Sequence, residues 1–296
     1  MSMPSPTPGT ARLMLLDGHN LVYRSYFAVR GLTRSDGRPT NATFGFLRVI
    51  EMLRAHWRPT HLCVMFDGGL PEERTSALPE YKAQRKPMPD DLRPQFGDIQ
   101  EYLRLADIPF VLTPGEEADD LIASAVVRSS REGARVHLVS SDKDLAQLCT
   151  DTVRIIIPGD PTRDYGPDGI RERMGVAPLQ IADWLALAGD TADNIPGVPG
   201  IGAKTAARIL EQCSSLDHLW EVLDTLDLTP RIKALLREHR PVVERNRTLT
   251  PLRTDLPLPS DWVQWTSRPT PPRVIPWLET MEFHSLARAQ QQPELF

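Results

Sequence analysis

The sequence predicts an α/β protein, in which a mostly parallel sheet flanked by helices is followed by a smaller helical subdomain. Short apolar runs alternate with stretches of helical spacing up to about residue 160, which is typical of βαβ units. The runs LMLL, LCVMF and VHLV are apolar throughout, as expected of strands that helices cover on both faces. Beyond them, helical stretches are joined by Gly/Pro turns, which indicates a separate helical unit.

Each element follows from this pattern. We expect strands at residues 12–16, 61–66, 108–112, 135–139 and 153–157, and helices between them at 44–57, 92–105, 119–131 and 144–148. The helical unit is expected to contain helices at 181–188, 203–211, 216–226 and 231–238. A proline-rich stretch at 250–276 leads to one last helix at 277–289. The expected organisation is a disordered start (1–10), an α/β domain (11–174), a helical subdomain (175–255) and a C-terminal arm (256–296) that packs back on the body.

Composition excludes several classes of protein. The 296 residues are 41% hydrophobic and 25% charged, as in globular proteins, and no apolar run approaches the roughly 20 residues of a membrane span. Residues 1–10 lack the features of a secretory signal, so we expect a cytoplasmic protein. The three cysteines form no CxxC pair and the seven histidines no HxxxH or HExxH spacing, so any metal must be held by oxygen ligands.

The net charge of −5 hides a segregation of charge. Nine of the 39 acidic residues stand at positions that can converge in the fold, and without them the 34 basic residues outnumber the acidic ones by four. The rest of the surface is therefore mildly basic, as binding to a nucleic-acid backbone requires.

The nine acidic residues cluster where strands and helices begin or end. Three predicted strands are followed by Asp17, by Asp67 and by the pair Asp142 and Asp144, and the carboxyl ends of parallel strands form the edge where such sheets bind ligands. The other five start or end helices: Glu117, Asp119, Asp120, Asp190 and Asp193. Each one alone is also compatible with a turn or a helix cap. Together they predict a cation site, because like charges about 4 Å apart cost about 4 kcal/mol per pair at an effective dielectric of 20.

The type of ligand indicates which cation. Carboxylates without histidine or cysteine select hard divalent ions, Mg²⁺ or Mn²⁺. Nine carboxylates are too many for one octahedral ion, so we expect two. A pair of ions about 3.5–4 Å apart is a recurring device for hydrolysing phosphodiesters. The residues alone therefore predict a two-metal phosphoryl-transfer enzyme.

Basic residues near position 82 could hold a phosphate backbone. The segment LPEYKAQRK places Tyr81 beside Lys82, Arg85 and Lys86, with Lys82 and Arg85 one helical turn apart. An aromatic side chain beside cations can stack on a base while the cations hold phosphates, although a solvated charge run is the plainer alternative. Four weaker candidates for the same role stay undecided: Arg24, Arg34, Arg38 and Arg74.

A second candidate for phosphate binding is the stretch NIPGVPGIGAKTAARIL. Tight turns at Gly197 and from Gly200 to Gly202 lead into a helix that begins near residue 203, so that backbone N–H groups and the positive helix end point outward together. Lys204 adds a positive charge in the first turn. A plain turn between helices is the alternative. Seven Lys or Arg between residues 231 and 253, against two glutamates, extend a possible duplex track.

In order and spacing, eight stretches of the chain resemble the bacterial and phage 5′ nuclease family, which includes the N-terminal module of DNA polymerase I and the flap endonucleases. They are LLDGHNLVYR, NATFGFLR, VMFDGG, LPEYKAQR, GEEADDLIAS, SSDKDLAQL, LALAGDTADNIPGVPGIGAKTA and RTDLPL. The resemblance extends over residues 12–286. It implies a resolvase-like (PIN-like) fold and a Mg²⁺-dependent, structure-specific 5′-3′ exonuclease and flap endonuclease that acts on DNA and on RNA primers in duplex.

The resemblance also implies roles for single residues. Ligands of a first metal ion would be Asp17, Asp67, Glu117 and Asp119, with Asp142 close to both ions. Ligands of the second ion would be Asp144, Asp190 and Asp193, with Asp120 at most behind the ligands. Lys82 and Arg85 would steer the scissile phosphate, and Tyr81 would lie where a helical arch at about 70–95 begins. Residues 194–204 would form a helix–hairpin–helix element that holds duplex DNA around a K⁺ ion.

Two positions depart from the family pattern, because Glu73 and Leu78 stand where aromatic residues are usual. The chain ends where a polymerase I would continue, and we expect a stand-alone, monomeric nuclease of the bacterial cytoplasm and nucleoid that works beside a DNA polymerase or ligase. Two alternatives are a catalytically impaired DNA-junction binding protein and a PIN-type ribonuclease. An aspartyl phosphatase is disfavoured, because no second aspartate follows two residues after Asp17.

Overall fold

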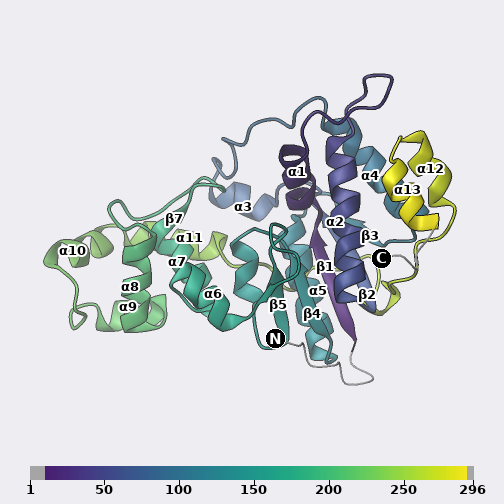
Figure 1. Ribbon diagram of the computed structural model, residues 1–296. Coiled ribbons are helices and arrows are strands. Elements are labelled where there is room, and N and C mark those ends of the chain that lie inside the picture. Colours follow the sequence, from purple (N-terminus) through teal and green to yellow (C-terminus); the bar gives the residue numbers. More distant parts are fainter. Residues whose placement is uncertain (1–10, 292–296) are drawn as a thin grey trace.

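The computed structural model describes residues 11–291, so the expected disordered start at 1–10 and the last residues, 292–296, lie outside the described part. The described chain forms a six-stranded sheet with helices on both faces, and a helical unit extends from one side of it (Figure 1). Within residues 11–291, no helix has the length and apolar character needed to cross a membrane.

The sheet has the strand order β3-β2-β1-β4-β5-β6 and is parallel except for β6. Its strands are β1 Arg12–Asp17, β2 His61–Phe66, β3 Phe110–Leu112, β4 Arg135–Val139, β5 Val153–Ile156 and β6 Asp164–Tyr165. Because β2 and β4 lie on opposite sides of β1, the strand order reverses there. In an open parallel sheet this reversal leaves a crevice at the carboxyl ends of the strands, which is where such folds bind ligands.

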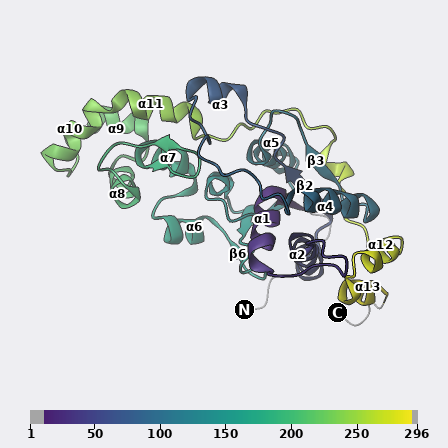
Figure 2. The same cartoon turned by 90° about the horizontal axis from the view of Figure 1, so that it is seen from above.

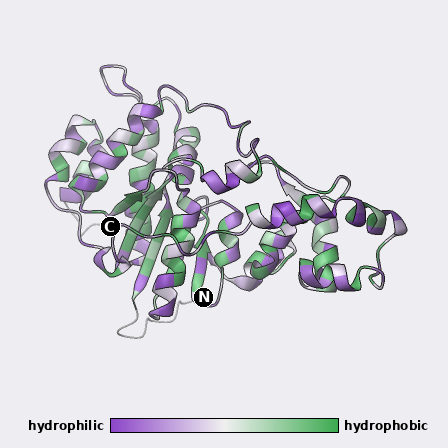
Figure 3. Ribbon diagram, turned by 180° about the vertical axis from the view of Figure 1, so that it is seen from behind, coloured by the Kyte–Doolittle hydropathy of each residue, from purple (hydrophilic) through white to green (hydrophobic). Residues whose placement is uncertain are grey.

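Helices cover both faces of the sheet because its strands are apolar on both. In β1, Met14 and Leu16 pack into one core cluster, and Leu13 and Leu15 pack into another. The first cluster holds side chains of α1 Gly18–Ala28, α2 Asn41–Trp57, α4 Arg93–Leu105, α12 Val274–Thr280 and α13 His284–Gln291. The second holds those of α5 Ala118–Arg131. Figure 2 shows α1 and α2 on the side of the sheet away from α5, and Figure 3 shows the strands as the most hydrophobic part of the body.

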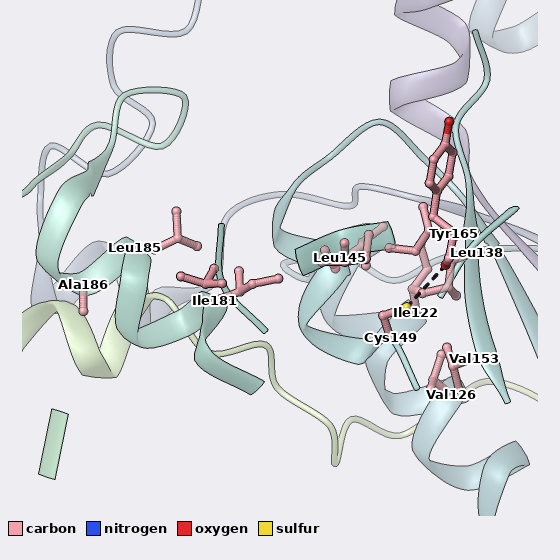
Figure 4. Close-up of a cluster of buried hydrophobic side chains, with 14 of the residues drawn as sticks. Ile122, Val126, Leu138, Leu145, Cys149, Val153, Tyr165, Ile181, Leu185 and Ala186 are labelled. Atoms are coloured by element: carbon pink, nitrogen blue, oxygen red, sulfur yellow. Dashed lines mark hydrogen bonds between the residues drawn. The ribbon is translucent and has the colours of Figure 1, made fainter. Parts of the chain in front are cut away.

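The helical unit shares its core with the α5 side of the sheet. It follows α6 Pro167–Met174, and its elements are η2 Pro178–Gln180, α7 Ile181–Ala188, α8 Ala203–Cys213, α9 Leu216–Val222, α10 Pro230–Glu238, α11 Arg240–Leu249, and a ribbon of β7 Gly189–Asp190 and β8 Ile195–Pro196. Ile181 and Leu185 of α7 belong to the same apolar cluster as Ile122 and Leu145 (Figure 4). In that cluster, the Cys149 thiol donates a hydrogen bond to the Tyr165 carbonyl at 3.4 Å. The continuous core fixes the helical unit against the sheet.

The C-terminal segment returns to the sheet after α11. The backbone N–H of Leu62 in β2 donates to the Trp265 carbonyl at 2.8 Å, next to η3 Trp262–Gln264. The single helix expected at 277–289 is wrong, because the chain forms α12 and α13 instead. Glu282 between them has a φ of 61°, a left-handed conformation that ends α12, and its carboxylate accepts a hydrogen bond from the Ser35 backbone N–H.

Several elements were not expected from the pattern. The helices α1, α3 Glu72–Ala77, α6 and α11 were not predicted, and the helix expected at 144–148 is the 3₁₀ helix η1 Asp144–Leu148. Residues 79–84 form turns in place of the helical turn assumed for Lys82 and Arg85, and Lys82 has a left-handed φ of 53°. The α1 helix was hidden because its buried positions are few: Gly18, Leu21, Val22 and Ser25.

Candidate active site

A cleft of about 900 Å³ opens at the carboxyl ends of β1, β2 and β4. Four of the predicted acidic residues line it: Asp17, Asp67, Asp119 and Asp142. Four of the predicted cations face them across the same cleft: Arg24, Lys82, Arg85 and Lys86. The strand-end aspartates therefore converge, as the parallel sheet requires, and the basic residues lie opposite them.

The aspartates of the cleft lie close enough together to oppose one another's ionisation; Asp17 is buried and the other three are half-buried. Asp17 ends β1 and caps α1, accepting hydrogen bonds from the Asn20 N–H at 3.0 Å and from the Ser140 hydroxyl at 2.8 Å. Burial, followed by the charges of Asp67 and Asp142, raises the pKa of Asp17 to about 7. Burial and the charges of Asp142 and Asp17 raise the pKa of Asp119 well above its usual value. Such a group of carboxylates is stabilised by a cation.

A second acidic group lies beside the first. Carboxylate oxygens of Asp144, Asp190 and Asp193 all lie within 4.8 Å of one another. Burial and the charge of Asp142 raise the pKa of Asp144 to about 7, and its Oδ1 is a buried acceptor without a hydrogen-bond donor. An all-oxygen donor set with an unsatisfied oxygen fits a hard divalent ion. The nine predicted acidic residues thus form two neighbouring groups, apart from Glu117 and Asp120.

Glu117 lies between the two groups and is surrounded by donors. Both Arg74 and Lys82 form ion pairs with its carboxylate, and the Tyr81 hydroxyl donates to it at 3.1 Å. The side chain of Lys82 also lies 3.3 Å from Asp193, so it links Glu117 to the second group. Since all of these contacts are buried, Glu117 fixes α3 and the turns after it against the acidic cleft.

Asp120 is a correction to the predicted metal ligands. It is fully buried, and both of its oxygens are occupied: Arg74 binds it with a bidentate pair at 2.8 and 2.9 Å, and Arg253 donates its backbone N–H at 2.9 Å and its Nε at 3.1 Å. Arg74 is likewise not available to a nucleic acid, because its side chain is buried in these ion pairs. The ion pairs of Asp120 with Arg74 and Arg253 connect α5 to α3 and to the segment after α11.

Replacing Arg253 by methionine should lower the free energy of unfolding by about 2 kcal/mol. The substitution removes charged hydrogen bonds from the buried Asp120 and from Glu116, while Arg74 still compensates part of the charge on Asp120. Urea unfolding of the two proteins measures the difference. An unchanged midpoint would mean that Asp120 is satisfied without Arg253.

Tyr81 also differs from its predicted role. Its ring is 3% exposed, and its hydroxyl donates to Asp193 at 3.0 Å and to Glu117. Leu78, one of the two departures from the family pattern, packs with Tyr81, Ile195 and Leu249. A buried ring cannot stack on a base, so Tyr81 positions carboxylates, and the aromatic signal in the sequence was misread.

The variant Tyr81→Phe distinguishes the two roles. Phenylalanine keeps the aromatic ring but lacks the hydroxyl. We therefore expect the variant to cleave a flap substrate about ten-fold more slowly, in line with one lost hydrogen bond to a charged group. Steady-state cleavage rates measure the change. Wild-type rates would instead support a role of the ring alone.

The remaining predicted cations are divided between the cleft and the surface. Arg85 donates to Asp193 at 2.9 Å and is half-exposed toward the cleft. Arg24 reaches over the cleft toward Gly159. Arg34 and Arg38 pair instead with Asp36 and Asp98 and do not line the cleft.

Three residues were missed, two that line the cleft and one beside the second acidic group. His19 accepts a hydrogen bond from the Asp67 N–H at 3.0 Å, and burial lowers its pKa, so a neutral imidazole holds Asp67 in place. Asn20 accepts from the Ser141 backbone N–H, and Lys143 reaches the second acidic group. A usable signal existed, because His19 and Asn20 follow Asp17 directly in DGHN and Lys143 stands between two predicted ligands.

The predicted hairpin lies apart from the cleft, in the helical unit. Gly197 is tightly packed, since a Cβ there would lie 2.3 Å from the Ala188 carbonyl carbon. Gly200 has a left-handed φ of 83°, and Gly202 precedes the first residue of α8. Lys204 lines a small hollow between α8 and α10. The N–H groups in the first turn of α8 have no partner within the helix, and Gly202 has no side chain to cap them.

Fold and site together define a class: a resolvase-like α/β protein with an acidic cleft at the switch point of its sheet and an attached helical unit. Residues 12–175 match the 5′-3′ exonuclease, N-terminal resolvase-like domain, and residues 176–272 match the 5′-3′ exonuclease, C-terminal SAM fold. The chain belongs to the 5′-3′ exonuclease family.

Known proteins agree with this assignment. The chain is 42% identical to a 5′-3′ exonuclease of Aquifex aeolicus over 214 residues, which cover 71% of this chain and 73% of that protein. It is 38% identical to the thermostable DNA polymerase I of Thermus aquaticus over 278 residues, covering 93% of this chain and 32% of the polymerase. The chain therefore spans about a third of the length of the polymerases it matches.

A solved structure of the bacteriophage T5 D15 flap endonuclease, a complex with DNA and metal ions, superposes with a TM-score of 0.66. The superposition covers 82% of this chain and 90% of the phage protein, at 27% identity. The α/β body and the helical unit are therefore both shared with a flap endonuclease.

Proposed function

We propose that the chain is a structure-specific 5′-3′ exonuclease and 5′-flap endonuclease that hydrolyses phosphodiester bonds of DNA, and of primer RNA in duplex, with two divalent ions. The observation that carries the proposal is the cleft, which is lined by four clustered carboxylates and four cations. The phage relative binds DNA and metal ions, which supports the same ligands here.

The carboxylates around the cleft would bind the metal ions, and the cations would bind the phosphate. Asp17, Asp67, Asp119 and Asp142 would hold a first Mg²⁺ or Mn²⁺, with Glu117 beside it, and Asp144, Asp190 and Asp193 would hold a second. The bound ions would supply Lewis-acid activation of water and neutralise charge at the leaving oxygen. Lys82 and Arg85 face the acidic groups and would orient the scissile phosphate and offset its charge.

The helical unit would hold the duplex. The N-terminal end of α8, with Gly200, Gly202 and Lys204, would offer N–H groups and one positive charge to a phosphate backbone, together with a bound K⁺ ion. Arg24 and Lys86 would hold the strand at the cleft. We assign nuclease chemistry to residues 11–174, with the arch at about 70–95, duplex binding to 175–255 and a packing role to 256–296. We further propose that the protein acts as a monomer in the bacterial cytoplasm and works beside a DNA polymerase or ligase.

The test is cleavage of a 5′-flap duplex by the purified chain in EDTA, Mg²⁺ and Mn²⁺, beside a blunt duplex, a single strand and single-stranded RNA. We expect cutting at the flap junction only with a divalent ion. Tight flap binding without cutting in either metal would favour a catalytically impaired junction-binding protein. Preferred cutting of single-stranded RNA would favour a PIN-type ribonuclease.

A further inference from the structure

Lys143 stands between two residues that face different acidic groups. Asp142 lines the cleft with Asp17, whereas Asp144 belongs to the group with Asp190 and Asp193. The ammonium of Lys143 lies in the second of these groups: its Nζ is 2.7 Å from Asp190 Oδ2 and 3.4 Å from Asp144 Oδ1. A lysine ammonium therefore lies among the carboxylates of the second group.

The two groups differ in this respect. Within residues 11–291, no lysine or arginine forms an ion pair with Asp17, Asp119 or Asp142, although cations pair with Glu117 nearby. The second group is neutralised by the chain itself, and the first is not. Lys82 and Arg85 pair with Asp193, so Lys143 is the cation that pairs with Asp144 and Asp190. Asp144 Oδ1 still lacks a hydrogen-bond donor, which leaves a carboxylate oxygen available to a metal ion.

We propose that Lys143 is a displaceable internal cation of the second acidic group, which neutralises Asp144 and Asp190 when no divalent ion is bound and must leave before one binds. This inference rests on the second metal position of the proposed function. Its consequence is that the two positions differ in affinity, because only the second has a competing cation built into the chain.

The surroundings of Lys143 allow its side chain to leave while the backbone stays. The Asp144 N–H donates to Asp142 Oδ1 at 2.9 Å, and the Asp142 N–H donates to the Ser140 hydroxyl oxygen at 2.9 Å. These bonds hold the turn before η1 in place. The side chain of Lys143 is 34% exposed, against 4% for Asp190, so rotation about its own bonds brings the ammonium into solvent.

The experiment compares the wild type with Lys143→Met, which has a similar length but no charge, and with Lys143→Arg, which keeps the charge. Lys233→Met, on α10 at the far end of the helical unit, is the matched control for loss of one charge (Figure 1). Metal-stripped proteins are titrated with Mn²⁺ alone, by calorimetry and by electron paramagnetic resonance of the free ion. Thermal unfolding is followed in EDTA and in Mn²⁺.

We expect two classes of Mn²⁺ site in the wild type. Lys143→Met should tighten the weaker class about ten-fold and leave the stronger one unchanged, whereas Lys143→Arg should not tighten it. In EDTA, Lys143→Met should unfold at a lower temperature than the wild type, and Mn²⁺ should raise its midpoint further, since its carboxylates lack a counter-charge. Lys233→Met should resemble the wild type in each measurement.

A weaker class that is unchanged or loosened in Lys143→Met overturns the role of Lys143. Asp190→Asn separates this failure from failure of the proposed function. If Asp190→Asn removes the weaker class, the second metal position stands whatever Lys143 does. If Asp190→Asn leaves both classes intact, the second position is wrong and the inference falls with it.

Discussion

The double variant Asp142→Asn, Asp144→Asn is expected to cleave a 5′-flap substrate at least about 1,000-fold more slowly than the wild type in saturating Mg²⁺. The two residues serve both acidic groups, so their replacement removes one carboxylate from each. A loss of this size corresponds to about 4 kcal/mol, which is the order of the charge stabilisation that bound divalent ions supply to a phosphoryl transition state.

The same substitution should have the opposite effect on stability. The charge of Asp142 contributes to the raised pKa of Asp17, of Asp119 and of Asp144, so removing it relieves repulsion in the metal-free protein. The double variant should therefore unfold at a higher temperature than the wild type in EDTA while it loses activity. Loss of both would mean that the variant is simply misfolded.

The matched control is Asp151→Asn, Asp255→Asn, which removes two charges from exposed aspartates outside the cleft. Its cleavage rate should equal that of the wild type. Single-turnover rates on a 5′-labelled flap give the comparison directly. Residual cleavage by the Asp142, Asp144 variant within ten-fold of the wild type would contradict the assigned roles of both carboxylates.

In the absence of divalent ions, the free energy of unfolding is expected to fall as the pH rises from about 4 to about 7. Burial and neighbouring charges raise the folded-state pKa of Asp17 and of Asp144 to about 7. An acid with a raised folded-state pKa binds its proton more tightly in the folded protein. Its stabilising protonation is complete below the unfolded-state value of about 4 and is lost as the pH passes through 7.

The expected size for Asp17 alone is on the order of 4 kcal/mol, because one pKa unit corresponds to about 1.4 kcal/mol and the shift begins from a value of 3.8. His19 works in the opposite direction. Burial lowers its folded-state pKa, so its contribution is lost as the pH falls. The comparison of the wild type with Asp17→Asn isolates the carboxylate from this histidine.

Urea unfolding at pH 5 and pH 8 in EDTA, repeated with Mg²⁺, measures the effect. The wild type should lose stability between the two pH values, Asp17→Asn should lose clearly less, and Mg²⁺ should restore most of the loss at pH 8. Asp255→Asn, at an exposed position, should follow the wild type. A pH dependence that is identical in Asp17→Asn and the wild type would contradict the burial of ionised carboxylates in the cleft.

The strand pattern and the strand-end aspartates were readable from the sequence because both depend on local features. An uninterrupted apolar run needs cover on two faces, and the first polar residue after a parallel strand lies at a defined edge of the sheet. Asp17, Asp67 and Asp142 were placed in one cleft on this basis, and the structure brings them together. Helices with a narrow buried stripe, such as α1, gave no comparable signal.

Side-chain partners were beyond the sequence because they come from distant parts of the chain. Asp120 and Tyr81 carry the same local signals as a metal ligand and a stacking aromatic, yet Arg74 and Arg253 occupy the first, and Glu117 and Asp193 hold the hydroxyl of the second. Lys143 was not predicted as a site residue, although it lies between two predicted metal ligands in the sequence. Only the fold shows that its ammonium enters the second acidic group.

The sequence by itself determined the parallel sheet, the acidic character of its carboxyl edge and the family to which the chain belongs, since strand patterns and motif spacing are properties of short segments. Only the tertiary structure decided which charged residues face the cleft and which neutralise one another in the interior. The reason is energetic: a buried charge is tolerated only beside an opposite charge, and that partner is supplied by chain folding over more than 100 residues, as for Asp120 and Arg253.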